Sequence, residues 1–211
     1  MHGLQAPTYE DIERYSVNRP DALEIISEPI FDFAAYPAAG TRELTFFQNQ
    51  VGSGGKNFED TNMKGNGFMP TPTKFMVTGL AVEYYPAALP GRSAAPNVST
   101  NWNDCYKILK SGLLTLNIGD KPFLTQGPIG MFPPTYRLAG ASALTGQSAV
   151  ANGVDGVDYA VFAGKEFRII PLTLPSTQNF NVTLSWATLV TVTAEARIGV
   201  RLFGFKYRAV Q

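Results

Sequence analysis

Histidine and cysteine are almost absent from this sequence, since each occurs once in 211 residues. The histidine is His2, so a histidine-based catalytic triad or a metal site with two histidines has no residues from which to form. The single cysteine, Cys105, excludes an intrachain disulfide and a cysteine metal cluster, and we expect it to be a buried thiol. The scarcity of both residue types predicts a protein that is not an enzyme and carries no cofactor or metal.

An excess of charge of either sign is also missing, because 17 Lys and Arg residues balance 17 Asp and Glu residues. A surface that coats nucleic acid needs clustered Lys and Arg, so we expect no specific nucleic-acid binding. Charged residues make up only 16% of the chain, and a net charge of zero removes the long-range repulsion between copies. Both features favour self-association.

Long apolar runs are absent as well. No stretch approaches the roughly 20 apolar residues that a membrane-spanning helix needs. Residues 1–6 lack the basic patch and the following apolar run of a signal peptide. We therefore expect a protein that has no membrane span, is made in the cytoplasm and stays soluble until it assembles.

The residues that are abundant are typical of strands and turns. The chain has 14 Phe and 9 Tyr residues, and these aromatics, together with many Val and Thr residues, favour strands over helices. Its 20 Gly and 15 Pro residues are dispersed, as suits turns between short strands. From residue 41 onward apolar residues alternate with a period of two, and no helical pattern alternates with the strands. The pattern predicts an all-β fold and argues against a parallel sheet with crossover helices.

Two local patterns give the sharpest predictions. In the strongest predicted strand, Phe75 and Val77 alternate, Gly79 interrupts, and the apolar positions resume with the opposite parity, which predicts a β-bulge at the glycine. Gly119 and Asp120 separate two apolar runs and predict a two-residue β-hairpin turn. Eight or nine short strands joined by long loops suit a single jelly roll or a related Greek-key β-sandwich.

We expect this sandwich over residues 41–211 and an extended N-terminal arm over residues 1–40. Residues 8–11 of the arm have the composition to cap a short helix. The prolines that follow favour an extended chain, and the apolar residues of the arm have no core of their own. The arm is therefore expected to pack either on its own sandwich or on a neighbouring subunit.

Chemistry-bearing motifs are weak. Residues 51–56 (VGSGGK) only superficially resemble a phosphate-binding loop, because Gln50 and Asn57 stand where that motif needs Gly and Ser or Thr. A carboxylate pair for sugar hydrolysis is the one enzymatic alternative, with candidates among Glu59, Asp60, Glu83 and Glu166. Oxygen ligands for Ca²⁺ are an alternative role of Asn152, Asp155 and Asp158, but beside glycines these residues more often form turns. Solvated loop and strand charges are the favoured interpretation.

Aromatic residues beside polar ones provide the other alternative, a platform for a sugar. The candidates are Tyr84, Tyr85, Trp102, Tyr106 and Trp186. In a strand-rich protein such residues more often belong to the core or to an interface. Trp186 ends an alternating run that contains Phe180, Val182 and Leu184, so we assign it to the core.

Several short segments, taken in order, resemble bacteriophage virion structural proteins with jelly-roll folds. They are LTFF at 44–47, DTNM at 60–63, KFMVTGLAV at 74–82, IGDK at 118–121, MFPP at 131–134, NFNVTL at 179–184 and VRLFGFKYRAVQ at 200–211. The resemblance covers most of the chain and includes no catalytic signature. It implies a capsid, coat or capsid-decorating role in a virion, where copies tile a shell through loops and arms. At 211 residues the chain has room for one jelly roll, not for the two of the larger capsid proteins.

We therefore expect a virion protein that self-assembles through threefold or fivefold contacts and binds other virion proteins. The alternative is a carbohydrate- or receptor-binding β-sandwich module of a viral fibre. The expected assembly contacts are the loop at residues 139–156 and five apolar residues of the arm, namely Tyr9, Ile12, Tyr15, Phe31 and Phe33.

Overall fold

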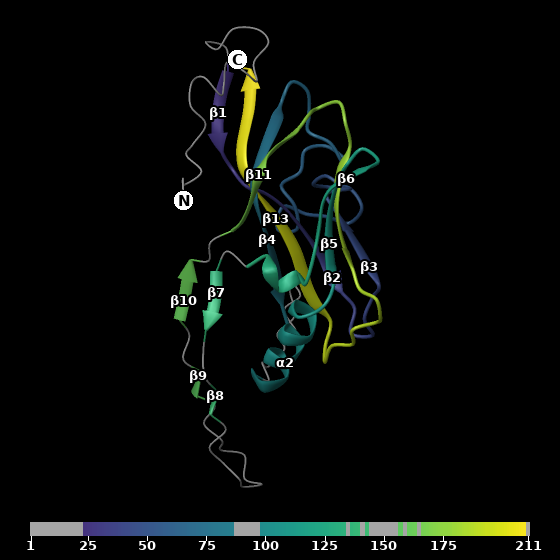
Figure 1. Cartoon of the computed structure of the whole chain (residues 1–211), viewed down its shortest axis with the longest axis vertical. Coiled ribbons are helices and arrows are strands. Elements are labelled where there is room, and N and C mark those ends of the chain that lie inside the picture. Colours follow the sequence, from purple (N-terminus) through teal and green to yellow (C-terminus); the bar gives the residue numbers. More distant parts are fainter. Residues whose placement is uncertain are drawn as a thin grey trace.

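Two antiparallel sheets packed face to face form a β-sandwich, as the computed structural model shows (Figure 1). The structure describes residues 23–86, 98–133, 136–139, 142–143, 156–157, 160–163 and 166–209. Among these residues, strands dominate and one α-helix, α2 (Val98–Leu109), lies at one end of the sandwich. The predicted all-β sandwich is confirmed.

The first sheet is built around the two longest strands. β13 (Ala196–Ala209) pairs along one side with β4 (Lys74–Tyr85), and β4 pairs in turn with β11 (Phe167–Leu174). On its other side, β13 pairs with β2 (Ile30–Tyr36) over its first half and with β1 (Leu23–Ser27) over its second half. All of these pairings are antiparallel.

The second sheet has the strand order β3, β12, β5, β6. Its strands are β3 (Glu43–Phe46), β12 (Phe180–Ser185), β5 (Leu113–Ile118) and β6 (Lys121–Gln126). Only the β5–β6 hairpin stays within this sheet. Every other connection along the chain from β2 to β6 and from β11 to β13 passes from one sheet to the other, as does the long connection from β6 to β11.

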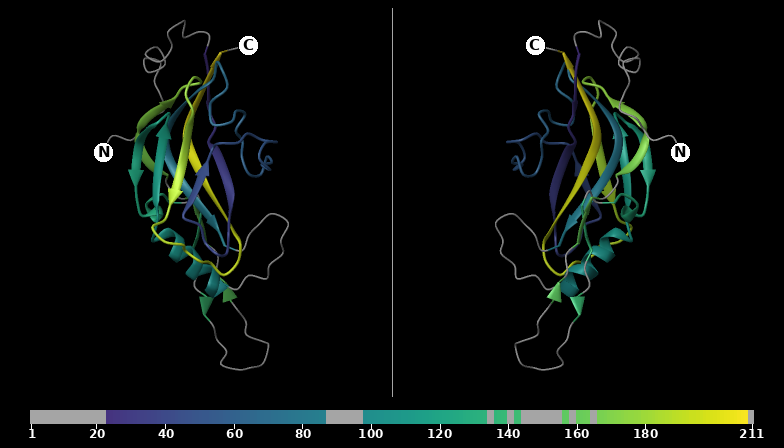
Figure 2. Two further views of the ribbon diagram at one scale, coloured as in Figure 1. Left: turned by 90° about the vertical axis from the view of Figure 1, so that its right-hand side faces the viewer. Right: turned by 90° about the vertical axis from the view of Figure 1, so that its left-hand side faces the viewer.

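That long connection contains a separate two-stranded ribbon. It is formed by β7 (Tyr136–Ala139) with β10 (Ala160–Ala163) and, further out, by β8 (Ser142–Ala143) with β9 (Gly156–Val157). The 3-10 helix η2 (Ile129–Met131) precedes the ribbon. The ribbon runs away from the sandwich on the side of α2, as the views from different directions agree (Figures 1 and 2).

The core lies between the sheets and contains the alternating apolar side chains of both. Phe46, Phe75 and Leu184 are completely buried, and Trp186 is 4% exposed, which confirms its assignment to the core. Burying each large apolar side chain stabilises the fold by about 1.5–3 kcal/mol.

Both sharp local predictions are confirmed. Phe203 pairs with Gly79 while Gly204 pairs with Val77, so Thr78 is an extra residue in β4 and forms the bulge. The core-facing parity changes there, because Phe75 and Val77 are buried on one side of the bulge and Leu80 and Val82 on the other. Ile118 pairs with Lys121 across the hairpin, and Gly119 has φ +57°, a conformation that glycine adopts without steric cost.

The division at residue 40 needs a correction. Sequence analysis assigned residues 23–36 to the arm, whereas the structure pairs β1 and β2 with β13 as strands of the first sheet. The prolines at positions 20, 29 and 37 favoured an extended arm, but they lie outside both strands and leave the pairing intact. Of the two alternatives, packing on its own sandwich is correct for this half. Residues 8–15, where a short helix was expected, lie outside the described residues.

Candidate assembly surface

One end of the sandwich, called the α2 end, collects four connections that hold one another in place. These are the turns at 37–42, 127–133 and 186–195 and the segment that contains α2. The backbone N–H of Val192 donates to Ala38 O at 3.0 Å, and that of Trp186 donates to Arg42 O at 2.8 Å. The N–H of Thr193 donates to Asp104 Oδ2 of α2 at 2.7 Å. Segments that are far apart in the sequence thus form one connected surface.

This end also exposes large apolar side chains. Tyr106 of α2 is 64% exposed and Leu189 of the 186–195 turn is 56% exposed, while Leu113 and Met131 are 38% and 39% exposed. We call these four residues the apolar collar. Because all four belong to connections or element ends at this end of the sandwich, they make it a candidate contact surface.

Beneath the collar, polar atoms are buried without hydrogen-bond partners. They are Tyr84 Oη, Asp104 Oδ1 and Trp186 Nε1, although Lys107 Nζ lies 3.6 Å from Asp104 Oδ1. The Tyr36 ring packs edge-on against Trp186 with centroids 5.4 Å apart. Burial raises the pKa of Tyr84, with Asp104 adding to the effect, so the phenol stays neutral.

The aromatic candidates whose side chains the structure describes do not form a shared sugar platform. Trp186 is buried, and Tyr85 donates from its hydroxyl to Glu83 Oε2 at 3.0 Å. Only Tyr106 among the described candidates is widely exposed. The side chain of Trp102 lies outside the described residues. Cys105 is half-buried, and burial raises its pKa to about 11, with Asp104 contributing, so the thiol stays protonated at neutral pH.

A second surface feature covers the outer edge of β2. We call residues 56–62 the edge clamp. The N–H of Phe33 donates to Asp60 O at 2.7 Å, and the N–H of Phe31 donates to Asn62 Oδ1 at 3.0 Å. Thr61 Oγ1 in turn donates to Phe31 O at 3.0 Å. The clamp therefore satisfies backbone groups that an open edge strand would offer to another chain.

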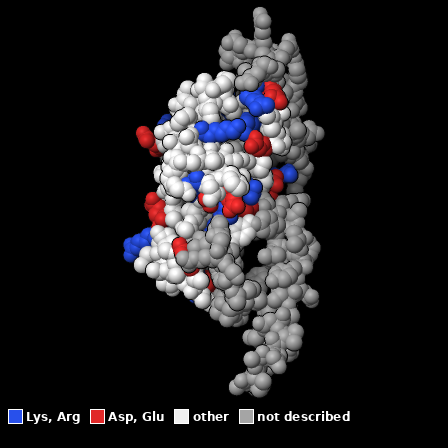
Figure 3. Space-filling model, turned by 180° about the vertical axis from the view of Figure 1, so that it is seen from behind, with Lys and Arg blue, Asp and Glu red and all other residues white. Residues whose placement is uncertain are grey.

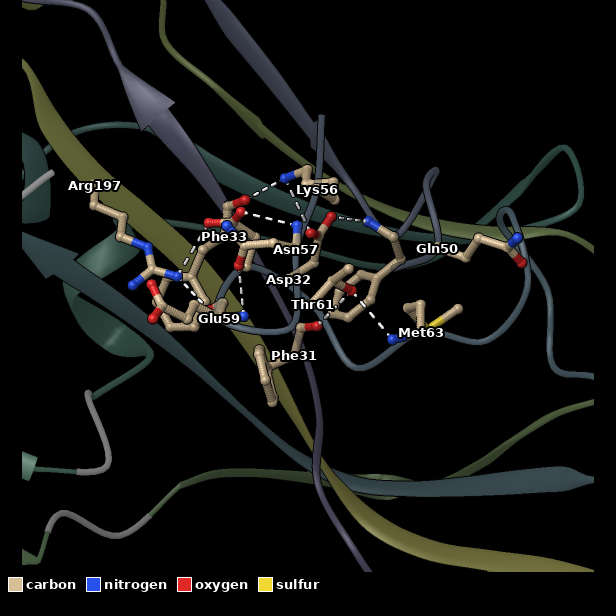
Figure 4. A network of polar contacts seen from close by, with 12 residues as sticks. Phe31, Asp32, Phe33, Gln50, Lys56, Asn57, Glu59, Thr61, Met63 and Arg197 are labelled. Carbon is tan, nitrogen blue, oxygen red and sulfur yellow. Dashed lines mark hydrogen bonds and ion pairs between the residues drawn. The ribbon is translucent and has the colours of Figure 1, made fainter. Parts of the chain in front are cut away.

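The clamp is held by a buried ion pair (Figure 4). Asp32 is 1% exposed, and its Oδ1 lies 3.0 Å from Lys56 Nζ, which also donates to Phe33 O. Asp32 Oδ2 accepts from the N–H of Phe47 at 2.6 Å, and Phe47 is held there at φ +68°. Burial raises the pKa of Asp32 despite the attraction of Lys56. Asp32 is buried and only 16% of the Lys56 side chain is exposed, so the pair serves the fold and offers little to a substrate.

Three of the four acidic candidates from the sequence are also engaged in ion pairs. Asp60 lies 3.2 Å from Arg197, Glu166 lies 3.4 Å from Arg168, and the buried Glu83 lies 3.0 Å from Arg201. In each of these three cases the partner is basic, and Glu59 is an exposed residue of the edge clamp, so the solvated or ion-paired interpretation of these acids fits better than a pair for sugar hydrolysis. No group of three His, Cys, Asp or Glu side chains in the described part of the chain is placed to hold a metal ion.

The glycine-rich segment at 51–56 forms turns and not a phosphate site. The N–H of Ser53 donates to Gln50 O at 3.0 Å, and the N–H of Lys56 donates to Ser53 O at 3.1 Å. Lys56, the only cation of that segment, is committed to Asp32. Beside the clamp lies an open groove of about 430 Å³, lined by Glu28, Gln50, Val51, Phe58, Thr61, Asn62, Met63 and Lys64. Phe58 projects there with 76% of its surface exposed.

Charge is distributed evenly over the face seen from behind (Figure 3). Basic and acidic side chains lie in small mixed groups between broad uncharged areas. Such a pattern lacks the clustered positive charge that a nucleic-acid-binding face needs. Within the described residues, no helix has the length and apolar character to cross a membrane.

No family model, curated protein or solved structure matches the chain. The interpretation of the α2 end therefore depends on its geometry and on the sequence alone.

Of the five arm residues predicted as assembly contacts, the structure describes Phe31 and Phe33, and these two differ in exposure. Phe33 is 5% exposed and lies under Arg197, whose guanidinium carbon is 4.4 Å from the ring centroid. It has little surface left for a neighbouring copy. Phe31 is half-buried, with Arg201 5.3 Å from its ring centroid. Tyr9, Ile12, Tyr15 and most of the 139–156 loop lie outside the described residues.

Sequence reasoning missed most of the collar. Tyr106 was considered only for a sugar platform, and Leu113, Met131 and Leu189 were not singled out. They stand in four separate connections or element ends, and each reads as an ordinary strand or turn residue in its own segment. Only the fold places their segments at the same end of the sandwich.

Proposed function

We propose that this protein is a non-enzymatic structural subunit that assembles with copies of itself and forms, or decorates, the shell of a virus particle. The observation that carries the proposal is the α2 end. There, hydrogen bonds between turns hold an apolar collar in place, and a two-stranded ribbon leaves the sandwich on the same side. A structured apolar surface with a projecting element suits contact between subunits.

The strand connectivity supports a jelly roll, which stays a prediction. The sheet orders β2-β13-β4-β11 and β3-β12-β5-β6, with nearly all connections passing between sheets, have the arrangement of two interlocking Greek keys. The connectivity agrees with the class that the sequence resembles. Fold alone does not determine function, so the connectivity supports the proposal and does not carry it.

The charge balance favours the same function. Net charge is zero, and buried charges such as Asp32 and Glu83 are paired inside one chain. Little electrostatic repulsion therefore opposes contact between copies. A shell, unlike an open fibre, needs closed symmetry, and we propose that this symmetry involves threefold or fivefold axes. A carbohydrate-binding module has less support, because Trp186, one of its proposed platform residues, is buried and Tyr84 and Tyr85 are only partly exposed.

Replacing Leu189 with glutamate tests the collar. A charge in the centre of a contact must be desolvated, and truncating or charging a contact residue of this kind typically costs more than about 1.4 kcal/mol, or tenfold in affinity. We expect association to weaken at least tenfold, measured by sedimentation velocity over a range of protein concentrations.

The matched control is Phe123→Glu. Phe123 is 52% exposed, close to the 56% of Leu189, but it lies on β6 near the hairpin turn, at the opposite end of the sandwich. It is expected to leave association within about threefold of the unchanged protein. Equal association of the Leu189 variant and the unchanged protein would contradict the role of the collar.

A further inference from the structure

The apolar collar needs a different surface to bind if copies close around a threefold or fivefold axis. Around such an axis each copy meets the next one head to tail, so one surface of a copy binds a second, different surface of its neighbour. A surface that binds its own equivalent joins only two copies, across a twofold axis. A ring therefore requires a complement to the collar elsewhere on the chain.

The groove beside the edge clamp is an exposed apolar surface of this kind. Among its lining residues, Phe58 is 76% exposed and Val51 is 43% exposed. The lining residues come from the connection between β1 and β2 and from the segment between β3 and β4, so the groove shares no element with the collar. Figure 2 shows the segment between β3 and β4, in blue, projecting from the sandwich apart from α2.

The groove has the size and the chemistry to hold a tyrosine side chain. Its volume of about 430 Å³ lies in the range of pockets that bind small ligands, so an aromatic ring has room. Val51, Phe58 and Met63 offer apolar contacts, and Gln50 offers an amide. That amide makes no hydrogen bond within the described residues, and Figure 4 shows it directed away from the ion pair of the clamp. Tyr106, the most exposed residue of the collar, has a ring and a hydroxyl group that match these contacts.

Opposite charges flank the two surfaces. Lys110 is exposed directly after α2, and its Nζ lies 4.8 Å from the centroid of the Tyr106 ring. Glu59 is an exposed residue of the edge clamp, and neither of these two charges forms an ion pair within the described residues. The charges of Glu28 and Lys64, which line the groove, cancel each other. The collar side is thus positive where the groove side is negative, which favours contact between them.

We propose that the collar of one copy binds the groove of the next copy, with Tyr106 inserted in the groove and Lys110 beside Glu59. The contact rests on the proposed function and adds the surface that the collar binds. Each copy uses its collar on one neighbour and its groove on the other, so the series closes into a ring. An aromatic side chain held in a pocket commonly contributes much of the binding energy of an interface.

Mixing two blocked variants of the full chain tests whether the contact joins different surfaces. Phe58→Glu blocks the groove and Leu189→Glu blocks the collar, so each variant alone is expected to associate at least tenfold more weakly in sedimentation velocity. In an equimolar mixture, the intact collar of the Phe58→Glu chain binds the intact groove of the Leu189→Glu chain. The mixture is therefore expected to form dimers that do not grow as the concentration rises.

Exchange of the two charges tests the orientation of the contact. Lys110→Glu places two glutamates together and is expected to weaken association about fivefold at low salt. The double variant Lys110→Glu/Glu59→Lys restores an opposite pair and is expected to associate within about twofold of the unchanged protein. Both effects should shrink at high salt, because the two charges lie at the rim and are screened.

Ile170→Glu is the matched control, because Ile170 is an apolar residue of β11 that is 90% exposed and belongs to neither surface. It is expected to change association by less than threefold, and circular dichroism establishes that each variant keeps its strands. A Phe58→Glu variant that associates as the unchanged protein does, or a mixture that stays monomeric, overturns the contact between collar and groove. If Leu189→Glu alone weakens association in that case, the proposed function stands without it; an unchanged protein that never associates overturns both.

Discussion

Replacing Lys56 with methionine is expected to destabilise the folded chain by about 3–5 kcal/mol at neutral pH. The substitution keeps most of the side-chain volume but removes the cation 3.0 Å from the buried Asp32. Asp32 is then a buried carboxylate without a counter-ion, and the clamp loses one of the contacts that join it to β2. Removing one partner of a buried ion pair costs far more than the intact pair contributes.

The loss is expected to depend on pH. Burial already raises the pKa of Asp32, and without Lys56 that pKa rises further, because the attraction that opposed burial is gone. A carboxyl group whose pKa is raised in the folded state destabilises the fold as the pH rises above its unfolded-state pKa, and the penalty is complete above the raised pKa. The penalty is relieved as the pH falls toward the ordinary aspartate value near about 3.9. The difference in free energy of unfolding between the two proteins should therefore be largest at high pH and shrink as the pH falls toward the ordinary aspartate pKa.

Urea unfolding followed by tryptophan fluorescence measures this difference at each pH. Lys64→Met is the matched control, since Lys64 is an exposed lysine of the same loop and should change stability by less than about 0.5 kcal/mol. A Lys56→Met variant with a pH-independent loss, or with no loss, would show that the ion pair does not hold the clamp.

Replacing Gly204 with alanine is expected to destabilise the fold by about 3 kcal/mol. An added Cβ would stand 1.8 Å from Met76 O and 2.8 Å from the carbonyl carbon. These are backbone atoms of the neighbouring strand, beside the bulge between β4 and β13, so they cannot move without breaking the pairing.

Gly55→Ala separates this steric effect from loss of glycine flexibility. Gly55 has φ +76° with open space around the position of a Cβ, so its substitution costs only the conformational penalty of about 1–2 kcal/mol. Thermal or urea unfolding should rank Gly204→Ala as the less stable of the two variants. The reverse order would contradict the close approach of β4 and β13.

The parts of the fold that were predictable depend on neighbours in sequence. The parity change at Gly79, the hairpin at Gly119 and the alternation that buries Trp186 are each contained in a short window. Strand alternation and turn chemistry act locally, so a single sequence reveals them.

The parts that were not predictable depend on contacts over long separations. Asp32 and Lys56 are separated in sequence by a turn and a strand, and the residues around neither of them predict a buried ion pair. Likewise, the sequence of β2 alone suggests an extended arm. Its partner in the sheet is β13, the last strand of the chain, which is more than 150 residues away in sequence. The collar has the same origin, since α2 and three turns meet only in the folded sandwich.

Sedimentation velocity of the unchanged full chain over a wide concentration range, with negative-stain microscopy of the same samples, tests the central claim most directly. The account predicts a concentration-dependent shift from the 22.9 kDa chain to larger closed species, seen as rings or shells. A single species of monomer mass at every concentration, with no particles in the images, would contradict it.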